Sequence, residues 1–291
     1  MFEGFERRTI ETTGATINLL TGGTGSPVLL LHGYPQTHVM WHKIAPQLAK
    51  DFFVVIPDLR GYGDSSKPPD GENHFGYSKR ATAQDQVEVM EHLGFKRFAV
   101  VGHDRGARVG HRLALDHSEQ VTKLVVFDIV PTHKLYHNVN KEFAAAYYHW
   151  FFLIQPPPFP ETLIGNNVEF YLNSLLGRLK PKAVIPEAFA EYLRCFQDPA
   201  TVHATCEDYR AAASIDLVHD EADMDRKIGC PVLALWAEKG LMPRMYDVIA
   251  TWRERAVTVS GKALPCGHFL PEEAPEETFA ELRAFLAAEN K

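Results

Sequence analysis

One stretch constrains the fold of this chain more than any other: an apolar run, a glycine-flanked turn and a helical run follow one another directly. The apolar run is Phe98 to Val101, the turn is Gly102-His103-Asp104-Arg105-Gly106, and the helical pattern continues to about His117. The order strand, turn, helix is the setting of the G-x-S-x-G motif, in which small residues permit a sharp bend and close helix packing. We therefore predict an α/β protein that displays Asp104 at the end of a buried strand.

Asp104 stands where that motif has serine, and this difference changes the expected chemistry. A carboxylate is already ionised at neutral pH, so it can attack saturated carbon directly and leave an ester for water to hydrolyse. The turn therefore argues against a serine esterase or protease and for displacement at an sp³ carbon. The strand and the flanking glycines disfavour the alternative, an ordinary surface aspartate in a loop.

Predicted strands alternate with predicted helices along the rest of the chain. Continuous apolar runs indicate strands buried on both faces, and amphipathic runs indicate helices. The predicted strands are a pair within Phe5–Leu20, then Pro27–Leu31, Phe52–Ile56, Val121–Phe127, Pro231–Trp236 and Ala256–Val259, and the helices include Trp41–Leu48, Ser78–Leu93 and Thr278–Ala288. Such alternation predicts a mainly parallel, doubly wound sheet with ligands at the carboxyl ends of its strands. Tyr34, Asp58, Asp104 and Asp128 follow such ends.

The pattern changes between about Pro131 and Asp220, where the sequence becomes helical and aromatic. We interpret residues 131–220 as a helical cap domain inserted over the active edge of the sheet. Residues 1–130 and 221–291 then form the core domain. The predicted fold class is α/β, a mainly parallel doubly wound sheet with an inserted helical cap.

Charge and composition argue against several other classes of protein. The net charge of −7 disfavours nucleic acid as a partner. The N-terminal residues lack the apolar segment of a signal peptide, and no apolar run approaches the roughly 20 residues that span a bilayer. The four cysteines are scattered, without the spacing of a disulfide framework or a zinc site. We expect a cytoplasmic protein with no membrane association and no metal.

An aspartyl ester requires a base that activates water, and histidine is the natural choice near neutral pH. The chain order of this fold class places the base in a loop after the last strand, where His268 is the candidate. That histidine needs a carboxylate to orient it. We favour Asp128, at the end of a buried strand, and keep Glu238, which follows the next strand, as the alternative.

Two arginines predict an anionic substrate. Arg105 follows the nucleophile directly and Arg108 lies one helical turn further on, so that they share a helix face. Two guanidinium groups beside a carboxylate nucleophile form a site for an anion. The alternative, that both arginines only neutralise Asp104 and Asp128, would weaken the nucleophile without a benefit. We infer a small carboxylic acid whose α-carbon faces Asp104.

The leaving group also needs hydrogen-bond donors. His149, Trp150 and Tyr209 lie in the predicted cap and together would suit a hard, strongly hydrated ion such as fluoride. Taken one at a time, each is more typical of a core aromatic residue or a surface histidine.

The chain resembles the fluoroacetate dehalogenases of the α/β-hydrolase superfamily over nearly its whole length. The motifs that carry the resemblance are His32-Gly33-Tyr34-Pro35-Gln36-Thr37-His38, Asp58-Leu59-Arg60-Gly61-Tyr62-Gly63, Gly102-His103-Asp104-Arg105-Gly106-Ala107-Arg108, Phe127-Asp128-Ile129-Val130-Pro131-Thr132, His149-Trp150, Asp208-Tyr209-Arg210 and Gly267-His268. The resemblance implies an α/β-hydrolase fold and hydrolysis of small 2-haloacids, fluoroacetate to glycolate and fluoride above all.

The same resemblance implies a role for each matching residue. Asp104 would be the nucleophile, and His268, oriented by Asp128, would activate water. Arg105 and Arg108 would hold the substrate carboxylate. The remaining roles are halide binding by His149, Trp150 and Tyr209, and stabilisation of the ester oxyanion by the main-chain N–H groups of Tyr34 and Arg105. The family implies a homodimer with no cofactor and no metal.

The sequence bears on four other functions, of which it disfavours the haloalkane dehalogenase and the receptor and leaves the other two open. A haloalkane dehalogenase would have a halide-binding tryptophan where Arg105 stands. An epoxide hydrolase would need two cap tyrosines, for which Tyr147, Tyr148 and Tyr209 are available. A non-catalytic receptor would not need Asp104, Asp128 and His268 together. A chloroacetate-preferring enzyme would share every residue named above.

Overall fold

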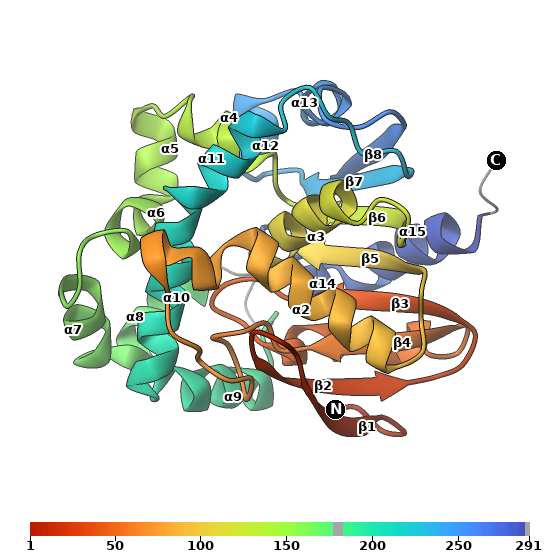
Figure 1. Cartoon of the computed structure of the whole chain (residues 1–291), viewed down its shortest axis with the longest axis horizontal. Helices are drawn as coiled ribbons and strands as arrows, with labels where there is room; N and C mark the ends of the chain where they lie inside the picture. The colour runs from red at the N-terminus through yellow and green to blue at the C-terminus, as the bar shows by residue number, and fades with distance from the viewer. Residues whose placement is uncertain (177–182, 289–291) are drawn as a thin grey trace.

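The computed structural model describes residues 1–176 and 183–288, and its strands form one eight-stranded sheet in the order β1-β2-β4-β3-β5-β6-β7-β8 (Figure 1). The strands are β1 (Glu6–Glu11), β2 (Thr16–Gly22), β3 (Ser26–Leu31), β4 (Phe52–Pro57), β5 (Phe98–His103), β6 (Val121–Phe127), β7 (Val232–Ala237) and β8 (Val259–Leu264). Strand β2 pairs antiparallel with β1 and β4, and the pairings from β4 through β3 to β8 are parallel. The predicted α/β-hydrolase fold with a mainly parallel sheet is confirmed.

Alternate residues along the central strands pack on opposite faces of the sheet, as the pleat of a strand requires. Leu29 of β3 and Val100 of β5 belong to one hydrophobic cluster, and their neighbours Leu30 and Val101 belong to the other. The first cluster includes residues of α2 (Lys79–His92), α3 (Arg105–Asp116) and α13 (Val248–Arg253), and the second includes residues of α1 (Ala45–Leu48) and α15 (Pro275–Ala287). Both faces are therefore covered, which is why the strand sequences are continuously apolar.

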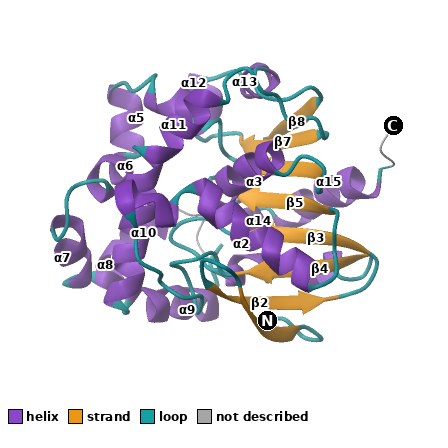
Figure 2. Ribbon diagram, in the orientation of Figure 1, coloured by secondary structure: helices purple, strands orange, loops and turns teal. Residues whose placement is uncertain are grey.

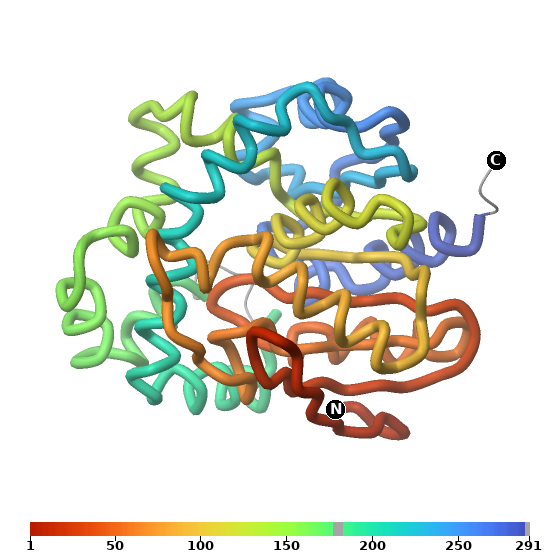
Figure 3. The backbone as a smooth tube through the Cα atoms, viewed as in Figure 1, coloured from red at the N-terminus to blue at the C-terminus, as the bar shows by residue number. Residues whose placement is uncertain are grey.

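A helical segment lies between β6 and β7, and its helices stand beside the sheet at the end toward which β5 points (Figures 1 and 2). Its helices are α4 (Thr132–Tyr136), α5 (Lys141–Ala146), α6 (Tyr148–Leu153), α7 (Phe159–Gly165), α8 (Val168–Leu176), α9 (Pro186–Phe196), α10 (Pro199–Ala212) and α11 (Ile215–Ala222). The tube in Figure 3 leaves the sheet in green and returns in cyan, so the segment is one excursion of the chain. We call it the cap segment. The division into domains at residues 131 and 220 stays a prediction.

The remaining elements are two 3₁₀ helices (His38–Trp41 and Glu72–Tyr77), α12 (Met242–Met245) and α14 (Leu270–Glu273). Ser78 caps α2, as its position predicts, because its hydroxyl accepts a hydrogen bond from the N–H of Ala81 at 3.1 Å. In the described part of the chain, no helix is both long enough and apolar enough to cross a bilayer.

Two predicted elements are wrong. The predicted helix Trp41–Leu48 is a 3₁₀ turn followed by the short helix α1, because Pro46 lacks the N–H that a helix continuing through it would need. The predicted strand Ala256–Val259 is displaced, and the strand at this edge is Val259–Leu264. Its alternating exposed positions, including Ser260 and Lys262, hide it from a search for apolar runs.

Candidate active site

Asp104 lies at the bend between β5 and α3, with φ of 47° and ψ of −113°. This backbone conformation is rare for a residue with a side chain and lifts the carboxylate out of the sheet edge. The bend depends on its two glycines. A Cβ on Gly102 would lie 2.5 Å from the Cα of Ala107, and one on Gly106 would lie 2.4 Å from the carbonyl oxygen of His32. The local sequence therefore has to be small on both sides of Asp104.

The two carboxylate oxygens of Asp104 have different surroundings. Oδ1 accepts a hydrogen bond from the main-chain N–H of Tyr34 at 3.2 Å, and Oδ2 lies 3.9 Å from Nε2 of His268. Burial alone would raise the pKa of Asp104, but the fields of His268 and Arg108 outweigh it and lower the pKa to about 2. The side chain is therefore ionised throughout the neutral range, with Oδ2 directed toward the histidine.

His268 contacts a second carboxylate through its other ring nitrogen. Nδ1 lies 2.6 Å from Oδ2 of Asp128, whose Oδ1 accepts a hydrogen bond from the N–H of Ala237 at 2.9 Å. Burial lowers the pKa of His268, but the hydrogen bond and charge of Asp128 outweigh it, so that the pKa lies above the ordinary 6.5. Glu238, the alternative orienting residue, is exposed at the surface. The geometry thus joins Asp104, His268 and Asp128 in one chain of contacts.

Glu273 holds the loop that carries His268, and sequence reasoning missed it. Its two carboxylate oxygens accept hydrogen bonds from the N–H groups of Gly267 and Phe269, each at 3.0 Å. On the other side, Nε2 of His103 lies 2.8 Å from the carbonyl oxygen of His268. A lone glutamate five residues after a histidine carries no recognisable signal, so only the folded loop reveals this role.

Arg105 is fully buried, and most of its guanidinium is occupied by Asp208 of α10. Nε donates to Oδ2 of Asp208 and Nη2 donates to its carbonyl oxygen, both at 2.6 Å. Asp208 also contacts Lys79 and accepts a hydrogen bond from the hydroxyl of Tyr62 at 2.9 Å. The sequence analysis did not assign a role to Asp208, although it lies in one of the motifs. Its partners lie between 103 and 146 positions away in the sequence and give no local pattern.

Arg108 is anchored differently. Its Nη1 donates to the carbonyl oxygen of Val130 at 3.1 Å and to the hydroxyl of Thr132 at 2.9 Å. Arg105 therefore does not offer the complete fork that the sequence suggested, whereas Arg108 donates both of its hydrogen bonds described above through Nη1 alone. Instead, within the described part of the chain, each keeps one buried nitrogen without a protein partner, Nη1 of Arg105 and Nε of Arg108.

Two of the three predicted halide ligands lie directly on these arginines. The Arg105 guanidinium lies 4.2 Å from the ring centre of Tyr209, and that of Arg108 lies 4.7 Å from the ring of Trp150. The hydroxyl of Tyr209 and Nε1 of Trp150 are buried and have no hydrogen-bond partner among the described residues. His149 is half-buried, with its ring centre 5.9 Å from that of Tyr209. Buried donors without partners are costly, so this group is suited to an anion.

A cavity of about 430 Å³ opens onto Asp104 and His268. Asp104, Asp128, His149 and His268 line it, together with Tyr34 and Tyr147. Lys239 and Arg244 also line the cavity. Its volume is that of a small-molecule site.

Removing the charge of Asp208 should destabilise the protein and loosen Arg105. The variant Asp208→Asn leaves two buried cations, Arg105 and Lys79, short of their counter-charge, which typically costs about 3–5 kcal/mol in the free energy of unfolding. Urea unfolding measures the loss. Asp64→Asn is the control, since its pairs with Arg7 and Arg194 are exposed and should contribute at most about 1 kcal/mol. Equal losses in both variants would contradict the importance of the buried network.

The fold and the site define a class of protein. Residues 26–275 match the family model described as alpha/beta hydrolase fold. The crystal structure of an α/β hydrolase from Nostoc sp PCC 7120 superimposes with a TM-score of 0.98, at 64% identity, and covers 99% of this chain and 100% of that one. The chain belongs to the α/β-hydrolase fold family, and it is an enzyme of the hydrolase class.

Relatives of known activity within this family include a dehalogenase and an epoxide hydrolase. A fluoroacetate dehalogenase from Burkholderia sp is 44% identical over 99% of this chain and 95% of its own length. A soluble epoxide hydrolase from Corynebacterium sp. is 34% identical over 94% of each chain. The predicted resemblance to the fluoroacetate dehalogenases is therefore confirmed.

Proposed function

We propose that this enzyme hydrolyses the carbon–halide bond of small 2-haloacids, with fluoroacetate converted to glycolate and fluoride. One observation carries the proposal: four buried donors have no hydrogen-bond partner among the described residues, and two of them belong to the arginines whose charges act on the carboxylate of Asp104. Nη1 of Arg105 and Nε of Arg108 suit a substrate carboxylate, and Tyr209 and Trp150 suit the departing halide. The 44% identity to a fluoroacetate dehalogenase supports the same substrate class.

The first step is displacement at carbon. Oδ1 of Asp104 is held by the N–H of Tyr34, which leaves Oδ2 as the attacking oxygen. A new C–O bond forms to the α-carbon while the C–F bond breaks, and fluoride departs with the bonding electrons toward Tyr209, Trp150 and His149. The product is an ester between Asp104 and a carboxymethyl group.

The second step is hydrolysis of that ester. His268 takes a proton from water, and the resulting hydroxide adds to the carboxyl carbon of Asp104. The main-chain N–H groups of Tyr34 and Arg105 are the proposed donors to the oxyanion that forms on Oδ1. Collapse releases glycolate, which receives the proton from His268. Asp104 retains one oxygen from water and loses the second water proton to solvent, because its pKa is about 2. Asp128 stabilises the imidazolium between these events.

The direct test is fluoride release from fluoroacetate, measured with a fluoride electrode, with chloroacetate in parallel and Asp104→Asn as the blank. Release of fluoride that depends on Asp104 supports the proposal. Release of chloride alone would support the proposed roles of Asp104 and the two arginines but would contradict fluoroacetate as the substrate. Release of neither halide contradicts the dehalogenase.

An epoxide hydrolase is the second candidate, and one observation favours it. Tyr147 lines the cavity, and the buried hydroxyl of Tyr209 has no hydrogen-bond partner among the described residues, so two cap tyrosines are available to activate an epoxide oxygen. A relative with that activity is 34% identical. A neutral epoxide, however, would leave the buried nitrogens of Arg105 and Arg108 unpaired. Diol formation from a panel of epoxides, without halide release from either acid, would establish this alternative.

Removing one halide donor should affect fluoroacetate more than chloroacetate. In Trp150→Phe the Nε1–H is lost, whereas an aromatic ring remains against Arg108. Loss of one such donor typically costs about 10²- to 10³-fold in kcat. We expect this loss for fluoroacetate and a smaller one for chloroacetate, because fluoride is the more strongly hydrogen-bonded ion. Parallel kcat measurements on both acids check this, and equal losses would contradict a halide-binding role.

The pH dependence should differ between the two steps. Attack needs ionised Asp104, whose pKa of about 2 keeps kcat/KM level across the weakly acidic range. Hydrolysis needs neutral His268, and the charge of Asp128 raises the pKa of this residue, so kcat falls as the pH drops through that raised pKa. Asp128→Asn should move the acid limb of kcat to lower pH. Parallel declines of kcat and kcat/KM, or a shift to higher pH, would contradict the assignment.

We also propose, from the family resemblance, that the protein is a cytoplasmic homodimer. Sedimentation equilibrium of the purified chain measures the oligomeric state, and a monomer at micromolar concentration would contradict the dimer.

A further inference from the structure

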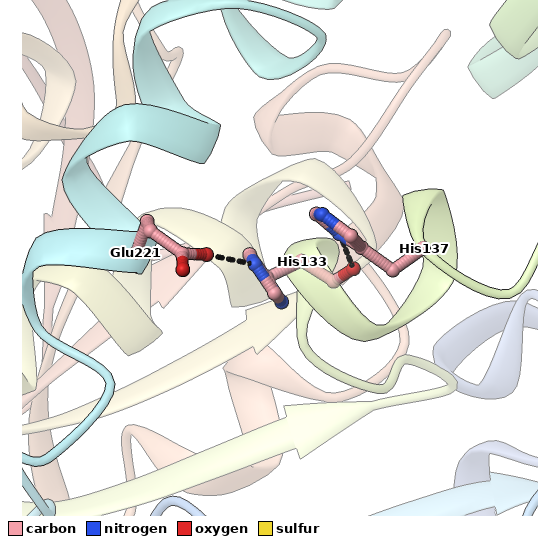
Figure 4. A group of neighbouring side chains, drawn as sticks. All are labelled: His133, His137 and Glu221. Atoms are coloured by element: carbon pink, nitrogen blue, oxygen red, sulfur yellow. Dashed lines mark hydrogen bonds and ion pairs between the residues drawn. The ribbon is translucent and has the colours of Figure 1, made fainter.

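Three side chains that could bind a metal ion meet at the surface, and none of them lines the cavity at Asp104 (Figure 4). His133 and His137 are one turn apart on and just after α4, and Glu221 comes from α11. Their ligand atoms all lie within 4.8 Å of one another. The sequence analysis found no metal-ligand pattern, because Glu221 is more than eighty residues away from the histidines.

The two imidazoles are oriented alike. Their ring centres are 3.8 Å apart with 20° between the planes, and Figure 4 shows both rings with a nitrogen toward Glu221. Nδ1 of His137 lies 2.9 Å from the carbonyl oxygen of His133, so Nδ1 carries the proton in this bond. This contact leaves Nε2 as the ligand atom, which is the way that main-chain carbonyls orient metal-binding histidines.

The third ligand already lies against the first. Nε2 of His133 is 2.5 Å from Oε2 of Glu221, whose side chain is 69% exposed and therefore free to rotate. A tetrahedral zinc centre with bonds of about 2.0–2.2 Å places its ligand atoms roughly 3.3 Å apart. Ligand atoms that lie within 4.8 Å of one another would reach that spacing once the stacked imidazole rings turn toward a common point, and water would supply the fourth ligand.

The three residues lie where the cap segment joins the sheet, so a metal ion bound to them would link its two connections. Helix α4 is the first element after β6, and α11 is the last helix before β7, so the three residues join the two connections of the cap segment (Figure 1). Helix α4 also begins with Thr132, which holds Arg108. A metal ion here would tie both connections together beside the residue that anchors a site arginine.

We propose that His133, His137 and Glu221 form a structural site for one zinc ion, or for another divalent transition metal that favours imidazole and carboxylate ligands. The site does not depend on the catalytic proposal. A second group, Asp70, His74 and Glu207, has comparable spacing. There the buried Glu207 is already paired with Arg210 at 2.7 Å, which makes it the weaker candidate.

Isothermal titration of the tag-free, chelator-treated full chain with ZnCl₂ tests the proposal. We expect one ion per chain, bound about tenfold or more weakly by His137→Ala, His133→Ala and Glu221→Gln. Zn²⁺ should also raise the thermal midpoint of the unmodified chain but not of the three variants, because a ligand that binds only the folded state stabilises it. All three side chains are at least partly exposed, so the variants should fold, which circular dichroism checks.

Two control variants make the outcome decisive. His92→Ala removes another exposed histidine and should leave the affinity unchanged. His74→Ala reports on the second group. The proposed site would be overturned if the unmodified chain did not bind Zn²⁺, or if the three ligand variants bound it as tightly as the unmodified chain. Loss of binding in His74→Ala alone would also overturn it.

Discussion

Asp104→Asn should abolish turnover of fluoroacetate, with a loss of roughly 10⁴-fold or more in kcat. The amide has no negative charge to attack carbon, and the other acidic side chains that line the cavity, Asp128 and Glu273, are engaged by His268 and by main-chain N–H groups. Folding should survive, because the amide can still accept the hydrogen bond from Tyr34. Fluoride release by the purified variant measures the loss.

Two further variants serve as controls for the loss of activity in Asp104→Asn. The amide in Asp104→Asn could itself be hydrolysed slowly by water that His268 activates, which would restore the acid, so Asp104→Ala serves as a second inactive variant. Asp225→Asn, which neutralises an exposed aspartate, is the matched control and should retain full activity. Substantial turnover by Asp104→Ala would remove Asp104 from the role of nucleophile.

His268→Asn should stop the cycle halfway rather than at the start. Displacement by Asp104 does not require the histidine, whereas ester hydrolysis does. We expect one fluoride per chain in a rapid burst and then a steady rate reduced by roughly 10³-fold or more. Mass spectrometry should find a carboxymethyl group on the peptide that contains Asp104, because the trapped ester is covalent.

The position of the added mass distinguishes between mechanisms. A single turnover of the unmodified enzyme in ¹⁸O-labelled water should place the label in Asp104, since water attacks the ester at the carboxyl carbon. Label in glycolate alone would instead indicate direct attack of water on the substrate. The exposed histidine variant His92→Asn should show neither a burst nor an adduct.

The predictable part of this molecule is the part with local causes. Strands β3, β5 and β6 are buried on both faces, so their apolar runs mark them with nearly correct ends. Asp128 was identifiable because it directly follows such a run, and Asp104 because it lies in a glycine-flanked turn between a strand and a helix. His268 followed from chain order, even though the preceding strand was misplaced.

The unpredictable part depends on contacts between distant residues. Asp208 and Glu273 act through partners that only folding brings near, the first across about a hundred positions and the second through main-chain N–H groups. Sequence spacing predicts Arg105 and Arg108 on one helix face, but it could not reveal which of their nitrogens are hydrogen-bonded within the protein. The sequence therefore indicated which residues could take part in the chemistry, but not which of their donor atoms are left free of protein hydrogen bonds.

The contact between Arg105 and Asp208 also bears on how such enzymes can diversify. Arg105 belongs to the sheet-bound helix α3 and Asp208 to α10 in the cap segment, so two stretches of the gene that could recombine separately share one ion pair. In a chimera with a foreign cap segment that lacks an acidic residue at the position of Asp208, Arg105 would stay buried without a carboxylate partner. A grafted cap segment should therefore give a stable chimera only when it includes the aspartate. The two residues of this ion pair are thus expected to be inherited together.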